Sequence, residues 1–120
     1  MRIFVMLGSF NMLLAVALGA FGAHGLKSRV SAEMLAVWQT AVLYHLVHAL
    51  GLLLVGLLAL QLPVRAAGWT LLAGIVLFSG SLYLMVLTGI RPLGMVTPLG
   101  GVAFLAGWLL LALAALKLTG

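Results

Sequence analysis

The chain has 120 residues, of which 66% are hydrophobic and only 6% charged, whereas an average soluble domain carries roughly 25% charged residues. So few ionic groups exclude a water-soluble fold of this size, and the lack of cysteine excludes disulfides and thiolate chemistry. The net charge of +5 comes from basic residues placed singly or in pairs at the edges of apolar runs, which indicates anchoring at lipid headgroups rather than the clustered basic face of a nucleic-acid-binding protein.

The continuous apolar runs predict an all-α integral membrane protein. In lipid, only helices and closed barrels satisfy every backbone polar group, and these runs lack the alternation that a barrel strand needs. We therefore expect residues 1–120 to form a single membrane domain, a bundle of four transmembrane helices. The expected spans are about 3–23, 38–60, 69–88 and 98–116.

The first apolar run extends from Ile3 to about Phe21. At 1.5 Å per residue it is long enough to cross a hydrocarbon core of about 30 Å. A cleaved signal peptide is the alternative interpretation, because residues 20–23 loosely resemble a cleavage site. The apolar core of a signal peptide is only about 7–15 residues long, which favours a retained span.

Small residues recur along one side of this first helix at spacings of three and four, and they predict a packing seam. The seam consists of Gly8, Asn11, Ala15, Gly19 and Gly22. Its small side chains would let a second helix approach closely, and the Asn11 amide can hydrogen-bond across such a contact. A substrate path along Asn11 is the alternative interpretation.

The second helix is expected to begin after a polar connection, with Ser31 as its cap. Glu33, the one acidic residue of the sequence, follows in the first turn, where the helix dipole favours an anion. No break occurs before Leu60, so the helix would exceed the membrane core by roughly 10 Å. We expect residues 31–38 to lie in the interface or to pack inside the bundle.

The third and fourth helices are expected to follow two short turns. Trp69 stands where an interfacial aromatic belongs, and Thr97 with Pro98 predicts a cap followed by proline at the first position of the fourth helix. Ala103 and Gly107 repeat the small-residue spacing and predict a second packing seam. The basic residues leave the orientation open, because Arg2, Arg65 and Lys117 fall on one side and Lys27, Arg29 and Arg91 on the other.

Polar residues on the second and third helices predict a buried polar cluster centred on His48. Ionisable side chains at membrane depth normally face the bundle interior or a wet cavity. The candidate members are His24, Glu33, Thr40, Tyr44, His48, Ser79, Ser81 and Tyr83. His45 lies towards the edge of the same face of the second helix.

Three interpretations of this cluster stay open. It can be interhelical hydrogen bonding that fixes which helix faces which, a proton or small-solute path past His48, or a metal or haem site that uses His45, His48 and His24. The metal interpretation lacks a sure third ligand. A serine hydrolase is disfavoured, since no second acidic side chain is available to orient a histidine. We predict no catalytic, metal or cofactor site.

Four motifs resemble those of the domain-of-unknown-function 423 family, small bacterial inner-membrane proteins that are similar to a small eukaryotic transmembrane family. The motifs are Gly19 to Leu26, Tyr44 with His48 to Leu50, Leu77 to Tyr83, and Thr97 to Gly101 with Phe104, Gly107 and Trp108. The resemblance implies a multi-pass inner-membrane protein and no particular activity. His24 and His48 fall on these motifs, whereas His45 stands where the resemblance leads us to expect glutamine, which disfavours a two-histidine metal site.

The sequence thus predicts a non-enzymatic integral membrane protein of the inner cell membrane that acts through helix or lipid contacts. The expected partners are membrane lipid and a second copy or another membrane protein, with nucleic acid excluded. The alternative is a small transporter or channel component with a proton or small-solute path past His48.

Overall fold

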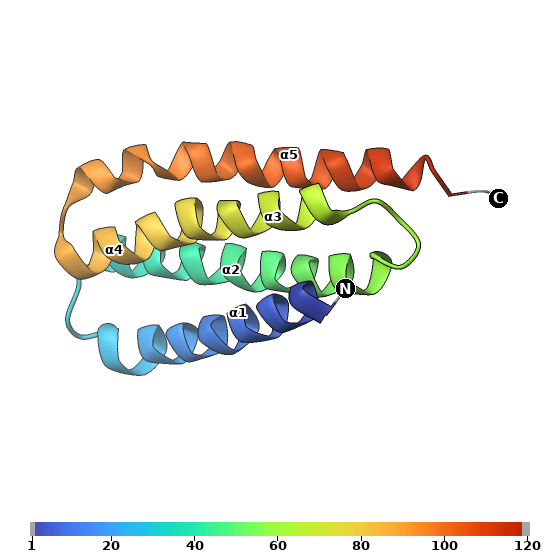
Figure 1. The fold of residues 1–120 in the computed structure, drawn as a ribbon. Coiled ribbons are helices and arrows are strands. Elements are labelled where there is room, and N and C mark those ends of the chain that lie inside the picture. The colour runs from blue at the N-terminus through green and yellow to red at the C-terminus, as the bar shows by residue number, and fades with distance from the viewer. Residues whose placement is uncertain (1, 119–120) are drawn as a thin grey trace.

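The computed structural model describes residues 2–118, and four long helical stretches lie side by side in it (Figure 1). Each is long and apolar enough to cross a membrane, which confirms the predicted all-α bundle. The elements in chain order are α1 (Arg2–Phe21), the π-helical turn η1 (Gly22–Leu26), α2 (Ala32–Leu58), α3 (Arg65–Gly74), the π-helical turn η2 (Ile75–Ser79), α4 (Gly80–Thr88), the 3₁₀ turn η3 (Arg91–Met95) and α5 (Thr97–Ala115).

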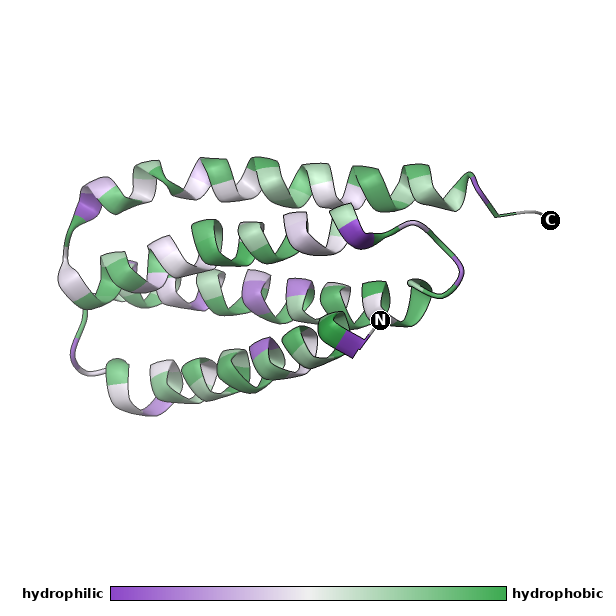
Figure 2. Cartoon of the chain, in the orientation of Figure 1, coloured by the Kyte–Doolittle hydropathy of each residue, from purple (hydrophilic) through white to green (hydrophobic). Residues whose placement is uncertain are grey.

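The third span is continuous from Arg65 to Thr88, because η2 joins α3 to α4 without a break. Successive spans run in opposite directions, so the starts of α1 and α3 and the end of α5 share one end of the molecule (Figure 1). We call this the Arg2 end, and the opposite end, where α2 begins and η3 lies, the Arg91 end. In Figure 2 the hydrophilic residues gather mainly at these ends, with a few in the middle of α1 and α2.

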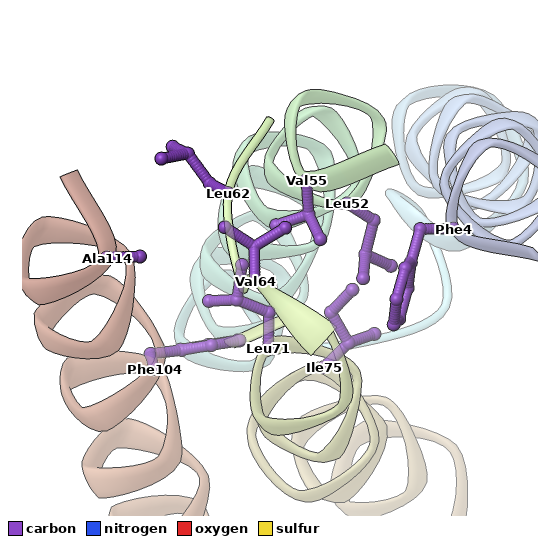
Figure 3. Close-up of a cluster of buried hydrophobic side chains, with 9 residues drawn as sticks. All are labelled: Phe4, Leu52, Val55, Leu62, Val64, Leu71, Ile75, Phe104 and Ala114. Atoms are coloured by element: carbon purple, nitrogen blue, oxygen red, sulfur yellow. The ribbon is translucent and has the colours of Figure 1, made fainter. Parts of the chain in front are cut away.

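The two central spans, α2 and the third span, pack against each other, and α1 and α5 lie on opposite sides of this pair (Figure 3). α2 also packs against α1, and the third span packs against α5. In the most apolar 18 residues of each span, the buried share is 44% in α2 and 50% in the third span, but only 22% in each of the two outer spans. The outer spans therefore present most of their apolar surface outward.

The largest hydrophobic core lies towards the Arg2 end and takes side chains from all four spans (Figure 3). It consists of Phe4, Leu52, Val55, Leu62, Val64, Leu71, Ile75, Phe104 and Ala114. The Phe4 ring occupies the space beside Gly68, where an added Cβ would collide with Cε1 and Cζ of the ring. A smaller core of Leu26, Trp38 and Val86 lies towards the Arg91 end.

The start of α2 agrees with its predicted cap, since the Ser31 hydroxyl accepts a hydrogen bond from the Met34 N–H at 3.1 Å. Of the two placements expected for residues 31–38, Trp38 takes the interior one. It is 1% exposed, and its Nε1–H donates to the Leu18 carbonyl of α1 at 2.8 Å. α2 is therefore tied to α1 near the Arg91 end.

The predicted cap of the fourth helix is wrong. α5 begins at Thr97 itself, and the Thr97 hydroxyl lies 2.6 Å from the hydroxyl of Ser81 on α4. The Thr97 hydroxyl therefore interacts with another helix and does not cap its own, since serine and threonine hydroxyls can bond to either local or distant groups.

Candidate functional site

His45 lies at the middle of α2 and connects three spans. Its Nε2 is 3.0 Å from Oδ1 of Asn11 on α1, and its Nδ1 is 2.9 Å from the hydroxyl of Tyr83 on α4. His45 is 4% exposed and Asn11 9%. One imidazole ring therefore holds the first and third spans against the second.

The hydrogen-bond partners determine which nitrogen of His45 carries the proton. Asn11 Nδ2 donates to the Leu7 carbonyl at 2.9 Å, so Asn11 Oδ1 is the atom that faces His45 and can only accept. His45 Nε2 must then be the donor, and Nδ1 accepts from the Tyr83 O–H. This tautomer of the neutral ring engages both nitrogens.

His48 lies one turn later on α2 and faces α5. Its Nδ1 donates to the Tyr44 carbonyl at 2.7 Å, so its Nε2 is unprotonated and accepts from the Trp108 Nε1–H at 3.0 Å. The ring also stacks on Phe104, with centroids 3.5 Å apart and planes 9° from parallel. His48 is thus the opposite tautomer to His45 and fastens α2 to α5.

Serine hydroxyls supply two further ties of the third span. Ser79 Oγ donates to the Ala41 carbonyl of α2 at 2.8 Å. Ser81 Oγ contacts the Phe78 carbonyl at 2.9 Å as well as the Thr97 hydroxyl at the start of α5. Among residues 2–118, every fully buried side-chain nitrogen or oxygen has a hydrogen-bond partner.

The structure corrects the expectation of one buried cluster around His48. His24, Glu33 and Thr40 lie on the surface, and Glu33 forms an exposed ion pair with Arg91 at 3.1 Å. Tyr44 is 40% exposed and contributes its carbonyl to His48.

Tyr83, expected with His48, instead meets His45. The reason is that α2 contacts other spans on more than one face. His45 faces α1 and α4, whereas His48 faces α5, because residues three apart on a helix point in directions about 60° apart. Ser79 and Ser81 bind backbone carbonyls and Thr97 rather than either histidine.

The small residues of the predicted seam on α1 lie against α2. A Cβ on Gly8 would lie 2.8 Å from the Leu53 nitrogen, one on Gly19 3.2 Å from Val42, and one on Gly22 2.7 Å from the Trp38 indole nitrogen. Asn11 bonds His45 on α2, and Ala15 is fully buried. The seam is a helix contact along the length of α1.

On α5, Gly107 lies against Leu71, with an added Cβ 2.6 Å from that side chain, while Ala103 is only half-buried. A closer approach occurs at Gly100, where an added Cβ would lie 2.7 Å from the Cα of Phe78 in η2. The seam therefore extends to the start of α5, and it brings α5 against the backbone of the third span.

Sequence reasoning missed Trp108 as the partner of His48. A signal was present, because a buried indole N–H usually finds an acceptor, and His48 was expected inside the bundle. Asn11 was expected to bond across a helix contact, but nothing in the sequence identified His45 as its partner.

His45 and His48 do not offer a metal site, since each of these two rings has one nitrogen donating and the other accepting a hydrogen bond. In the part of the chain that the structure describes, no group of three or more His, Cys, Asp or Glu side chains gathers to hold an ion. The arrangement is suited to holding helices together.

Replacing Trp108 with phenylalanine keeps an aromatic ring but removes the donor to His48 and the part of the indole that packs beside Gly51. We expect the free energy of unfolding in detergent to fall by about 1 kcal/mol, as for an interhelical hydrogen bond in a membrane. Trp69→Phe is the control, because Trp69 is 44% exposed and packs edge-on against Phe4. Equal losses in the two variants would contradict the assignment.

Two open grooves flank the bonded histidines. One, of about 490 Å³, lies over Gly80 between α1 and the start of α5, with Asn11, His45 and Tyr83 in its lining. The other, of about 560 Å³, lies between α2 and α5 and is lined by aromatic side chains, among them Tyr44, Phe104 and Trp108. Each has a volume typical of ligand pockets, roughly 300–1,000 Å³.

Comparison with known proteins gives a family match and several full-length relatives. A family model described as "Protein of unknown function (DUF423)" matches residues 18–101. UPF0382 membrane protein YwdK of Bacillus subtilis is 54% identical, over 98% of this chain and 98% of that protein. UPF0382 membrane protein SERP0230 of Staphylococcus epidermidis is 48% identical over the whole of both chains.

UPF0382 membrane protein SAB0533 of Staphylococcus aureus is 47% identical, again over the whole of both chains. No solved structure matches the chain. These relatives carry the name of membrane proteins and no enzymatic name, and the four apolar spans agree with that. The chain is an integral membrane protein.

Proposed function

Because this chain belongs to the family described as "Protein of unknown function (DUF423)", we propose that it is a non-enzymatic, multi-pass protein of the inner cell membrane. In this proposal it acts through helix and lipid contacts made by its outer surface. Its partners are membrane lipid and a second copy or another membrane protein.

The observation that carries the proposal is that the polar side chains in the middle of the spans form hydrogen bonds within the bundle. His45 and His48 each have both ring nitrogens bonded to other parts of the bundle. A proton on Nε2 of His48 would face the Trp108 N–H, so that two donors would oppose each other. His48 is therefore suited to a fixed neutral state, and a proton path past it has little support.

The outward surface supports the same proposal. Large apolar side chains on α1 and α5 point away from the bundle, with Leu13 64% and Leu109 59% exposed. In a membrane such surfaces contact lipid chains or apolar helices. Water is absent there, so the hydrophobic effect does not favour burying these side chains within the bundle.

A transport role has one specific observation in its favour, and it concerns His45 rather than His48. The Tyr83 hydroxyl can turn its proton away and accept from a protonated Nδ1, so His45 could gain a proton without losing either partner. A path through the hydrogen bonds of Asn11, His45 and Tyr83 is therefore the second candidate.

Liposomes that contain a pH-sensitive dye separate the two candidates. We expect the reconstituted protein to leak protons no faster than empty liposomes do, and His45→Gln and His48→Gln to behave alike. A proton flux in the wild type that His45→Gln abolishes, with the variant still folded, would replace our proposal with the transport role.

The contact part of the proposal is tested by single cysteines, which the cysteine-free chain makes unambiguous. Cysteines at Leu13 and Leu109 should give crosslinks to a second copy or to lipid probes in native membranes. A cysteine at Leu52, which is fully buried, should give none. No crosslink at either outer position would remove the support for a contact function.

A further inference from the structure

The groove over Gly80 is hollow and almost entirely apolar. We call it the Gly80 groove. Leu14 and Leu18 of α1 form one wall, Leu93 and Val96 form the other, and Val76 and Gly80 lie along its floor. It is open on its outer side, which would face hydrocarbon if these spans cross a membrane.

The length of the Gly80 groove along the spans corresponds to one leaflet. Asn11 and His45 mark its inner limit near the middle of the spans, and Leu18, Leu84 and Leu93 lie towards the Arg91 end. From residue 11 to 18 or from 76 to 84, a helix rises about 10–12 Å, less than half of a core of about 30 Å. A helix of another protein would cross both leaflets, whereas one lipid chain fits this length.

The charges at the Arg91 end favour an anionic headgroup above the groove. Lys27, Arg29 and Arg91 are exposed there, against the single acid Glu33. Arg91 belongs to the same 3₁₀ turn as Leu93, which lines the groove. The Arg91 side chain is 67% exposed despite its ion pair, so its guanidinium can still donate to a phosphate.

The polar groups in the groove already have hydrogen-bond partners within the protein and do not need a polar ligand. Tyr83 and Asn11 already bond His45, and every fully buried side-chain nitrogen and oxygen of residues 2–118 has a partner. A bound molecule would therefore be held by apolar contact along the groove and by charge at its mouth.

From this geometry we infer that the Gly80 groove binds one acyl chain of an anionic phospholipid, with the phosphate at Arg91 and the neighbouring loop cations. The inference rests on the lipid-contact part of the proposed function and names the lipid class and the place.

Gly80→Leu tests the inference because the new side chain would enter open space. An added Cβ meets only the Ile75 carbonyl oxygen, at 3.9 Å, so the fold should be kept while the groove is filled. Native mass spectrometry would compare retention of phosphatidylglycerol and phosphatidylcholine from nanodiscs. We expect wild type to retain phosphatidylglycerol preferentially, and Gly80→Leu to retain it about tenfold less, a difference of one decade in affinity.

Two further variants make the result specific. Gly101→Leu fills the other groove, where an added Cβ lies 4.0 Å from Phe78, and it should retain phosphatidylglycerol as wild type does. Arg91→Gln should reduce the preference for phosphatidylglycerol over phosphatidylcholine without abolishing binding, because the apolar groove is intact and Lys27 and Arg29 remain.

Unchanged lipid retention in Gly80→Leu would overturn the inference. Loss of a dimer in that variant, with lipid retention unchanged, would assign the groove to a second copy instead. Either result leaves the proposed function standing, since that depends on the separate proton-flux and crosslinking experiments.

Discussion

Replacing Gly100 with alanine is expected to separate α5 from the bundle, with a loss of about 3 kcal/mol or more in the free energy of unfolding, at the upper end of overpacking effects. The added methyl carbon would lie 2.7 Å from both Cα and Cβ of Phe78. Backbone atoms inside a helical span cannot turn aside as a flexible side chain can, so the two helices must move apart.

Gly101→Ala is the matched control, because the neighbouring glycine points elsewhere. A Cβ on Gly101 meets only Cδ2 of the Phe78 ring, at 4.0 Å, which is ordinary van der Waals contact. Unfolding by SDS in mixed micelles would measure both variants. If the two alanines prove equally harmless, the close approach of α5 to η2 is wrong.

Replacing His45 with leucine is expected to lower the free energy of unfolding by about 2 kcal/mol, because it leaves Asn11 and Tyr83 without their buried partner. His45→Gln should lose much less. A glutamine amide can donate to Asn11 Oδ1 while its carbonyl accepts from the Tyr83 hydroxyl, which reproduces the donor and acceptor of the neutral imidazole.

A double-mutant cycle in detergent would measure this coupling. Asn11→Leu should destabilise the wild type more than it destabilises the His45→Leu protein, since the bond is already absent there. Additive losses would mean that Asn11 and His45 do not interact, and a glutamine variant as unstable as the leucine variant would contradict the proposed bonding pattern.

Local features of the fold could be read from the sequence. The four apolar runs predicted four spans because lipid demands a continuous helix at each, and Ser31 predicted a helix start because its cap needs only the adjacent turn. The cap expected at Thr97 was wrong because the Thr97 hydroxyl contacts the hydroxyl of Ser81, which is sixteen residues away in the sequence.

The polar interior could not be assigned in the same way. A helical wheel shows which residues of α2 share a face, but not that α2 has neighbours on two sides. For that reason Tyr83, the partner of His45, was assigned to His48, and His45 was placed at the edge. The sequence likewise does not distinguish Gly100 from Gly101. In the structure, only a Cβ on Gly100 would meet backbone atoms of Phe78.

The direction of the donors in the two histidine networks has a consequence for proton movement. Tyr83 donates to His45, His45 to Asn11, and Asn11 to the carbonyl of Leu7. Trp108 donates to His48, and His48 to the carbonyl of Tyr44. With both rings in these neutral tautomers, each series of donors runs one way and ends at a peptide oxygen, which has no hydrogen to pass on. Proton movement through His45 would therefore require the Tyr83 hydroxyl to turn.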